Sequence, residues 1–123
     1  MPPEDRDRAL IRDMLDSSRA VVEMAAGLTF EVFCSDRKTR RAIEREIEII
    51  GEAARHISRL FQDAHSEVPW PRISATRNRL AHEYGAIQNE ILFRIATFHI
   101  PELIELLENL SGGQNEGEEH QDC

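Results

Sequence analysis

The sequence lacks the features that several specialised protein classes need. Its two cysteines, Cys34 and Cys123, lie far apart and have no metal-ligand spacing, so we expect neither a disulfide framework nor a zinc site. No apolar run approaches the roughly 20 residues that cross a bilayer, so no membrane span is expected. No stretch alternates β-branched with polar residues, so strands are not expected either. We therefore expect a soluble, folded, helical protein.

Length and charge narrow the class further. The 123 residues suffice for one domain, and 41% hydrophobic residues are typical of a folded chain. The net charge of −8 argues against indiscriminate nucleic-acid binding, although a local basic site stays possible. The N-terminal residues Met1 to Asp5 contain no basic segment leading into an apolar stretch, so we expect no signal peptide and a cytoplasmic location.

Apolar spacing predicts two helices in the first half of the chain. The first is expected over about 5–27, where apolar residues recur every three or four positions. The second is expected to run to about residue 61, capped by Ser35 or Asp36. Its apolar face is wide enough to pack on several neighbours or to form a dimer surface. Gly51, which costs about 1 kcal/mol relative to Ala in a helix, predicts a close helix crossing.

Proline and glycine mark the helices of the second half. Pro71 suits the first turn of a third helix, expected to end near Glu83, and Gly85 can adopt the left-handed conformation that follows. A last helical stretch begins near Gln88, and Pro101 either kinks it or divides it in two. The fold class predicted is all-α, a small bundle of four or five helices.

The C-terminal segment differs in composition from the rest. Residues 111–123 are rich in Gly, Gln and Glu, and their four acids account for half of the net charge of −8. Such a segment buries too little apolar surface to fold alone. We predict one helical domain over residues 1–110, followed by a disordered acidic tail.

One segment gathers side chains suited to phosphodiester chemistry. Between Trp70 and Gly85 stand Arg77, Asn78, Arg79, His82 and Tyr84. Metal-free RNA cleavage needs a base for the 2′-hydroxyl, an acid for the leaving oxygen and a cation for the phosphate. Histidine can perform either proton transfer near neutral pH, and arginine offers phosphate a rigid fork of donors.

The spacing of Arg77 and His82 points to a dimer. Five positions correspond to about 140° around a helix, so the two side chains do not converge on one straight helix. If two copies meet across a two-fold axis, the same residues of both chains can share a cleft. We therefore expect a homodimer with a composite site.

These residues resemble the HEPN superfamily, and within it the HepT-like toxins of HepT/MntA toxin–antitoxin pairs. The resemblance is carried by the Arg-x4-His-x-Tyr motif over Arg77–Tyr84, the preceding Pro69-Trp70, and the segment Ile49–Ala54 in the second helix. With the order of the helices, the likeness covers about residues 9–110.

The resemblance implies a homodimeric, metal-independent endoribonuclease that needs no cofactor. Arg77 and His82 would be catalytic, and Asn78, with Arg79, would support the site. The resemblance also implies a partner, a minimal nucleotidyltransferase antitoxin that transfers AMP from ATP to Tyr84. An AMP group there would oppose RNA by bulk and by like charge.

Simpler interpretations stand beside these. Arg77 alone suits a surface ion pair, Asn78 a helix surface, and Tyr84 packing against Trp70. A basic run, with Glu44 as its only acid, either guides RNA or forms a solvated helix face. It comprises Arg37, Lys38, Arg40, Arg41 and Arg45. Four histidines share no spacing with a second ligand and are interpreted as structural or exposed: His56, His65, His99 and His120.

Two other functions stay open. The chain resembles the non-catalytic binding subunits of minimal nucleotidyltransferases, which share this helical architecture but generally lack an intact Arg-x4-His motif. It also fits a degenerate toxin that is retained for its partner. RNA cleavage in EDTA that His82→Ala abolishes would favour the enzyme over both.

Overall fold

The fold is all-helical, as the sequence predicts. The computed structural model describes residues 3–81 and 85–119, with side chains over 5–81 and 85–110, and it contains no strand in these ranges. The elements are α1 (Pro3–Ala25), α2 (Phe30–Ser35), α3 (Arg37–His56), α4 (Arg59–Ala64), α5 (Trp70–Ala81), α6 (Gly85–Arg94), the π-helical segment η1 (Ile95–His99) and α7 (Ile100–Glu119). The described residues thus hold more helices than the four or five predicted. None of them is long and apolar enough to cross a membrane.

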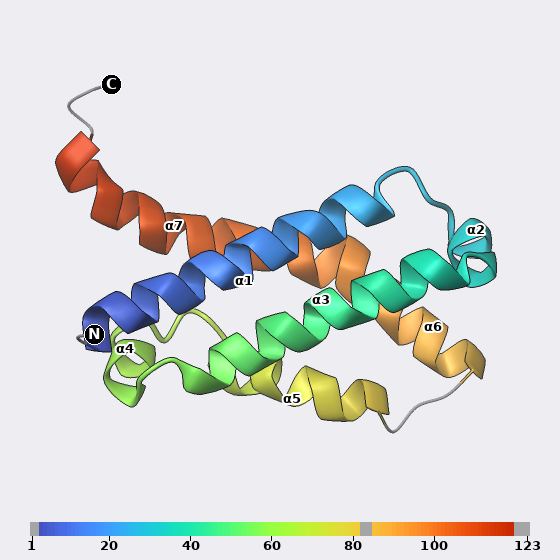
Figure 1. Ribbon diagram of the computed structural model, residues 1–123, viewed down its shortest axis with the longest axis horizontal. Coiled ribbons are helices and arrows are strands. Elements are labelled where there is room, and N and C mark those ends of the chain that lie inside the picture. The colour runs from blue at the N-terminus through green and yellow to red at the C-terminus, as the bar shows by residue number, and fades with distance from the viewer. Residues whose placement is uncertain (1–2, 82–84, 120–123) are drawn as a thin grey trace.

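The long helix α3 is the centre of the bundle. It lies between α1, to which it is antiparallel, and α5, while α6 and α7 cross behind (Figure 1). The core forms between these layers, where Met14, Phe33, Ile43 and Leu107 are fully buried. The wide apolar face of α3 therefore packs on several neighbours within one chain, which is one of the two uses the sequence analysis allowed for it.

Capping fixes where α3 begins. The Asp36 carboxylate accepts hydrogen bonds from the Thr39 backbone N–H at 3.0 Å and from the Thr39 hydroxyl at 2.8 Å. These bonds hold the pKa of Asp36 below its ordinary value. Of the two predicted caps, Asp36 is therefore the one used.

The α3–α4 junction corrects the predicted end of the second helix. α3 ends at His56, and not near residue 61, because Ser58 caps a new helix by accepting from the Phe61 N–H at 3.2 Å. Buried Asp7 of α1 accepts from the Ser58 N–H at 2.8 Å and from its hydroxyl at 2.7 Å. A buried carboxylate is tolerated where such bonds satisfy it, so Asp7 ties α1 to this junction.

The short helix α2 was not predicted. Its six residues are too few to show a helical period, although Thr29 caps it by accepting from the Val32 N–H at 3.2 Å. Phe33 packs against Phe93, with ring centroids 5.0 Å apart, so α2 rests on α6.

Gly51 lies where α3 crosses α5, as predicted. A Cβ atom at this buried glycine would stand 3.3 Å from the Ile73 carbonyl oxygen and 4.0 Å from the Arg77 Cβ. The absence of a side chain therefore lets α5 approach α3 closely, directly beneath Arg77.

The last helical stretch passes through a π-turn before Pro101. The Ile100 N–H donates to the Ile95 carbonyl, five residues back. Because Pro101 has no N–H and its ring crowds the preceding turn, the wider turn accommodates it without ending the helix. α7 then continues to Glu119, further than the apolar spacing predicts. The disorder expected for residues 111–123 stays a prediction.

Candidate functional site

The start of α5 is anchored in the core. Trp70, the first residue of the helix, is buried, and its indole N–H donates to the His65 carbonyl at 3.0 Å. Its ring also meets that of Phe61 edge-on, with centroids 6.2 Å apart. The helix therefore leaves this anchor in a fixed direction and carries the predicted site at its other end.

The structure describes part of that predicted site. Arg77, Asn78 and Arg79 are exposed in the last turns of α5, and Leu80 beside them is buried. The predicted catalytic His82 and the predicted modification site Tyr84 lie outside the described residues. Beyond them, Gly85 has a φ of +67°, the left-handed conformation that the sequence predicts.

The two ends that flank this gap are joined by Gln88 of α6. Its side-chain amide donates to the Leu80 carbonyl at 3.1 Å and to the Glu44 carboxylate at 3.2 Å. A hollow of about 140 Å³ opens beside it, with Arg41 and Gly85 in its lining. The basic N-terminal half of α3 therefore adjoins the end of α5.

Arg77 faces an open, charged hollow of about 480 Å³ between α1, α3 and α5. Its lining includes Asp13 of α1, Arg45 and Glu48 of α3, and Glu52 one turn further along. The Arg77 side chain is 58% exposed, and its Nη1 atom lies 3.8 Å from Oε1 of Glu52. This distance makes the contact an ion pair and not a hydrogen bond.

Three basic side chains, those of Arg55, His56 and Arg77, lie within 4.0 Å of the Glu52 carboxylate. Its Oε2 atom accepts a hydrogen bond from Nη2 of Arg55 at 3.1 Å and lies 3.7 Å from Nδ1 of His56. The hydrogen bond from Arg55 is the largest influence that lowers the pKa of Glu52, and the charges of Arg55, His56 and Arg77 lower it further. Glu52 belongs to the Ile49–Ala54 segment that carries part of the family resemblance, but nothing in the sequence alone gives its carboxylate a role.

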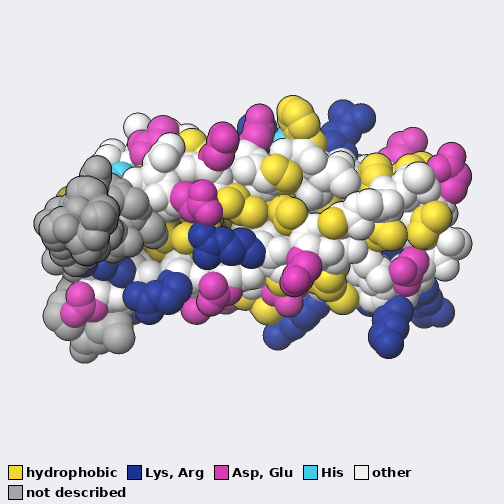
Figure 2. All heavy atoms as spheres, turned by 90° about the horizontal axis from the view of Figure 1, so that it is seen from above, with side chains coloured by type: hydrophobic (Ala, Val, Ile, Leu, Met, Phe, Trp, Pro, Cys, Tyr) yellow, Lys and Arg dark blue, Asp and Glu magenta, His cyan; other side chains and the backbone are white. Residues whose placement is uncertain are grey.

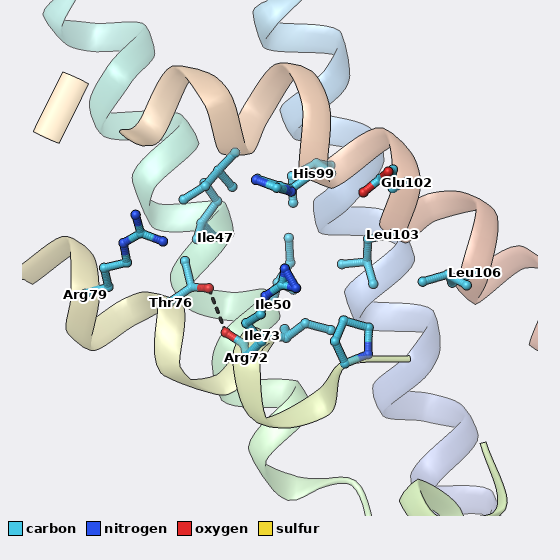
Figure 3. Close-up of a pocket in the computed structure, with 13 residues that line it drawn as sticks. Ile47, Ile50, Arg72, Ile73, Thr76, Arg79, His99, Glu102, Leu103 and Leu106 are labelled. Carbon is cyan, nitrogen blue, oxygen red and sulfur yellow. Dashed lines mark hydrogen bonds between the residues drawn. The ribbon is translucent and has the colours of Figure 1, made fainter. Parts of the chain in front are cut away.

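Arg79 lies on a different side of α5, although it is two residues from Arg77. It lines a groove of about 170 Å³ between α5, η1 and α7. Figure 3 shows Ile47, Ile50 and Leu103 lining this groove together with the polar side chains of Arg72, Arg79, His99 and Glu102. The structure therefore does not bring Arg79 together with Arg77, which the sequence analysis had grouped in one site.

The predicted RNA-binding run also divides. Arg37, Lys38 and Arg41 are exposed on α3, whereas the Arg40 guanidinium donates to the Phe33 carbonyl at 3.1 Å and to the Cys34 carbonyl. Arg40 thus satisfies carbonyls at the end of α2. Elsewhere, basic and acidic side chains alternate with exposed apolar ones on the face that Figure 2 shows.

No group of three His, Cys, Asp or Glu side chains that could hold a metal ion is found among the described residues. The chemistry that the described part of the site offers is that of a guanidinium and an amide, held near the end of a helix.

Comparison with known proteins assigns the family. The family described as "Ribonuclease HepT-like" matches residues 14–110. The chain belongs to the HepT-like ribonuclease family. Among its relatives, "Putative RNase MJ0127" of Methanocaldococcus jannaschii is 31% identical over 91% of this chain and 95% of its own. "Probable ribonuclease HepT" of Thermococcus cleftensis is 32% identical over 81% of this chain and 91% of its own. No solved structure was found to match.

Membership of the HepT-like ribonuclease family confirms the resemblance drawn from the Arg77–Tyr84 motif. The matched range contains α3 and α5 whole, so it includes both the Gly51 crossing and the exposed end of α5.

Proposed function

We propose that this HepT-like protein is an endoribonuclease that cleaves RNA without a metal ion, at a site where Arg77 and His82 of two chains meet. The observation that carries the proposal is the exposed Arg77 guanidinium in the last turns of α5, in a chain of the HepT-like ribonuclease family. Exposure matters because a phosphate can reach only a guanidinium whose donors face solvent.

The proposed reaction needs two proton transfers and one fixed cation. The 2′-hydroxyl loses its proton to one His82 ring while its oxygen attacks the phosphorus. The bond to the 5′-oxygen breaks, and this oxygen takes a proton from the other His82 ring, leaving a 2′,3′-cyclic phosphate. Arg77 meets the charge on the non-bridging oxygens, and the Asn78 amide adds a hydrogen bond. A homodimer supplies both histidines.

RNA is held, in this proposal, by basic side chains beside the reacting phosphate. Arg37, Lys38 and Arg41 are exposed in the first turns of α3, and Arg41 lines the hollow beside Gln88, which adjoins the end of α5. Arg79 reaches the RNA from the far side of α5. Arg40 is left out, because its Nη1 atom already donates to two carbonyls at the end of α2.

The activity is proposed to be that of a toxin in a toxin–antitoxin pair. A minimal nucleotidyltransferase would silence it: the Tyr84 phenol oxygen attacks the α-phosphorus of ATP, loses its proton and releases pyrophosphate. The resulting AMP group, two residues from His82, would place a phosphate and a base where the RNA must bind.

The decisive experiment incubates unmodified protein with total RNA in EDTA. We expect cleavage, with losses on the order of 10²- to 10⁴-fold in His82→Ala and Arg77→Ala. Arg59→Ala is the matched control, because Arg59 pairs with Asp63 on α4, whose Phe61 packs at the start of α5 and not at the end that carries Arg77. Activity that EDTA removes would contradict the metal-free mechanism. No cleavage, together with a tight nucleotidyltransferase complex, would favour a binding subunit.

The regulatory part is tested separately by mass spectrometry. Co-expression with a minimal nucleotidyltransferase should add one or more adenylyl groups to the chain, and Tyr84→Phe should prevent this. Adenylylation that persists in Tyr84→Phe would contradict the assignment of the acceptor.

A further inference from the structure

The Arg77 guanidinium has one carboxylate within ion-pair distance among the described residues, that of Glu52. The two side chains come from different helices, α5 and α3, so their contact depends on how these helices cross. Gly51 permits the close crossing, because a Cβ there would stand 3.3 Å from the Ile73 carbonyl oxygen and 4.0 Å from the Arg77 Cβ. Gly51 of α3 thus lies next to the Cβ of Arg77, and the following residue, Glu52, carries the carboxylate next to its guanidinium.

The two oxygens of Glu52 have different partners. Oε2 accepts a hydrogen bond from Arg55 at 3.1 Å, within the same helix. Oε1 lies on the side of Arg77, at 3.8 Å from its Nη1 atom. Because Arg55 bonds to Oε2, the Glu52 carboxylate presents its other oxygen to the long, exposed Arg77 side chain.

We propose that Glu52 is a positioning residue that holds the Arg77 guanidinium where the RNA phosphate will meet it. The inference rests on the proposed ribonuclease function and names a residue which that proposal does not use. At 3.8 Å the contact consumes no short hydrogen bond, so the five N–H donors of the guanidinium stay available to phosphate. Holding the side chain in advance reduces the rotamer entropy lost when the guanidinium meets the charge that develops on the phosphate in the transition state, so the effect falls on kcat.

A surface ion pair with no role in catalysis is the alternative, and the protein contains a matched example. One turn earlier on α3, Glu48 lies 3.5 Å from Arg45. Glu48 lines the same hollow and is 44% exposed, against 47% for Glu52. Exposed pairs of this kind contribute little to stability, so neither carboxylate is needed for folding. Glu48→Gln is therefore the control for Glu52→Gln.

The test measures kcat and KM of the full chain on one RNA substrate, for the wild type and both glutamine variants. We expect Glu52→Gln to lower kcat by about tenfold to a hundredfold, the range that a misplaced catalytic group produces. KM should change little, Glu48→Gln should match the wild type, and both variants should melt within a few degrees of it. An equal kcat in Glu52→Gln and Glu48→Gln would overturn the proposal. A lower KM in Glu52→Gln without loss of kcat would also overturn it, because Glu52 would then compete with RNA.

A double-mutant cycle checks that Glu52 acts through Arg77. In an Arg77→Lys background the ammonium cannot reproduce the guanidinium fork, so Glu52→Gln should cost clearly less there than in the wild type. An undiminished effect would contradict a role through Arg77. If Arg77→Ala and His82→Ala keep full activity, the proposed function fails. If they lose activity while Glu52→Gln does not, only the present inference fails.

Discussion

Arg77 and Arg79 belong to the same helix, α5, but lie in different surroundings on its two sides. On one side, Arg77 stands in a charged hollow and has the Glu52 carboxylate at 3.8 Å. On the other, Arg79 borders a groove with an apolar floor and has no carboxylate within 4.0 Å among the described residues. Residues two positions apart on an α-helix are rotated by about 200° around its axis, so the Arg77 and Arg79 side chains point to opposite sides of α5. The comparison teaches that adjacency in a motif does not mean a shared site.

The largest expected difference between the two sides of α5 is in kcat, when Arg77→Ala is compared with Arg79→Ala. Arg77→Ala should lower kcat by roughly 10²- to 10³-fold, the effect of removing one donor from a developing negative charge. Arg79→Ala should leave kcat unchanged and raise KM by less than about tenfold, because Arg79 contacts RNA only in binding. Steady-state kinetics on one RNA substrate measures both.

Equal losses of kcat in the two variants would break the comparison, since both arginines would then act at the reacting phosphate. Arg59→Ala, on α4, controls for the loss of one positive charge from the surface.

The surroundings of Arg77 depend on the close approach of α3 and α5. The next test therefore changes Gly51, where these helices cross. In Gly51→Val the new side chain would press on the Ile73 carbonyl, already 3.3 Å from a Cβ at this position. We expect the free energy of unfolding to fall by about 1–3 kcal/mol, the usual cost of overpacking. Chemical denaturation measures it.

Gly51→Ala serves as the control. Alanine gains up to about 1 kcal/mol of helix propensity over glycine, which offsets a contact that is tight but short of a clash. It should therefore unfold near the wild type. Wild-type stability in Gly51→Val would mean that α5 moves away easily, and the positioning of Arg77 by this crossing would be wrong.

Features that local interactions determine could be predicted from the sequence, whereas features that depend on contacts between helices could not. Local signals succeeded: Asp36 caps α3, Gly85 adopts a positive φ, and apolar spacing predicts the all-helical fold. Gly51 succeeded as well, because a glycine inside a strong helical pattern costs stability and needs a packing reason.

Contacts between distant segments could not be predicted. The hydrogen bonds of Arg40 depend on the place of α2, a helix that was not predicted. The separation of Arg79 from Arg77 follows from helical spacing, but the groove that Arg79 lines depends on where η1 and α7 lie. The end of α3 was missed because the apolar rhythm continues to Phe61, whereas Ser58 starts a new helix that Asp7 of α1 secures. Of these hydrogen bonds, only those of Asp7 join partners distant in sequence, because Asp7 lies 51 residues before Ser58.

Salt dependence separates the arginines that meet phosphate from those that do not. In a His82→Ala background, which binds RNA without cleaving it, the logarithm of affinity should fall linearly with the logarithm of salt concentration. Removing one phosphate contact to a single strand should reduce that slope by about 0.7. We expect this change for Arg41→Ala and Arg79→Ala in fluorescence anisotropy titrations.

Arg40→Ala is expected to behave differently. Because its guanidinium is bound to carbonyls at the end of α2, its loss should lower the melting temperature and leave the salt slope unchanged. A reduced slope in Arg40→Ala would return it to the RNA surface.

The smallest expected effect is on the pH dependence of stability. The hydrogen bond from Arg55 and the nearby charges of Arg55, His56 and Arg77 hold the pKa of Glu52 below its ordinary value. A carboxyl whose pKa is lower in the folded state stabilises the fold fully above its unfolded pKa, about 4.3 for glutamate. That contribution is lost as the pH falls through the folded pKa.

The melting temperature of Glu52→Gln should therefore lie slightly below that of the wild type at neutral pH, and the difference should close as acid is added. The effect is small because the side chain is 47% exposed and its partners are screened by water. Arg79 has no carboxylate within 4.0 Å among the described residues. The difference in melting temperature between Arg79→Ala and the wild type should therefore stay constant over the same pH range. If the differences in melting temperature of both variants from the wild type close together as the pH falls, the Glu52 carboxylate does not distinguish the two sides of α5.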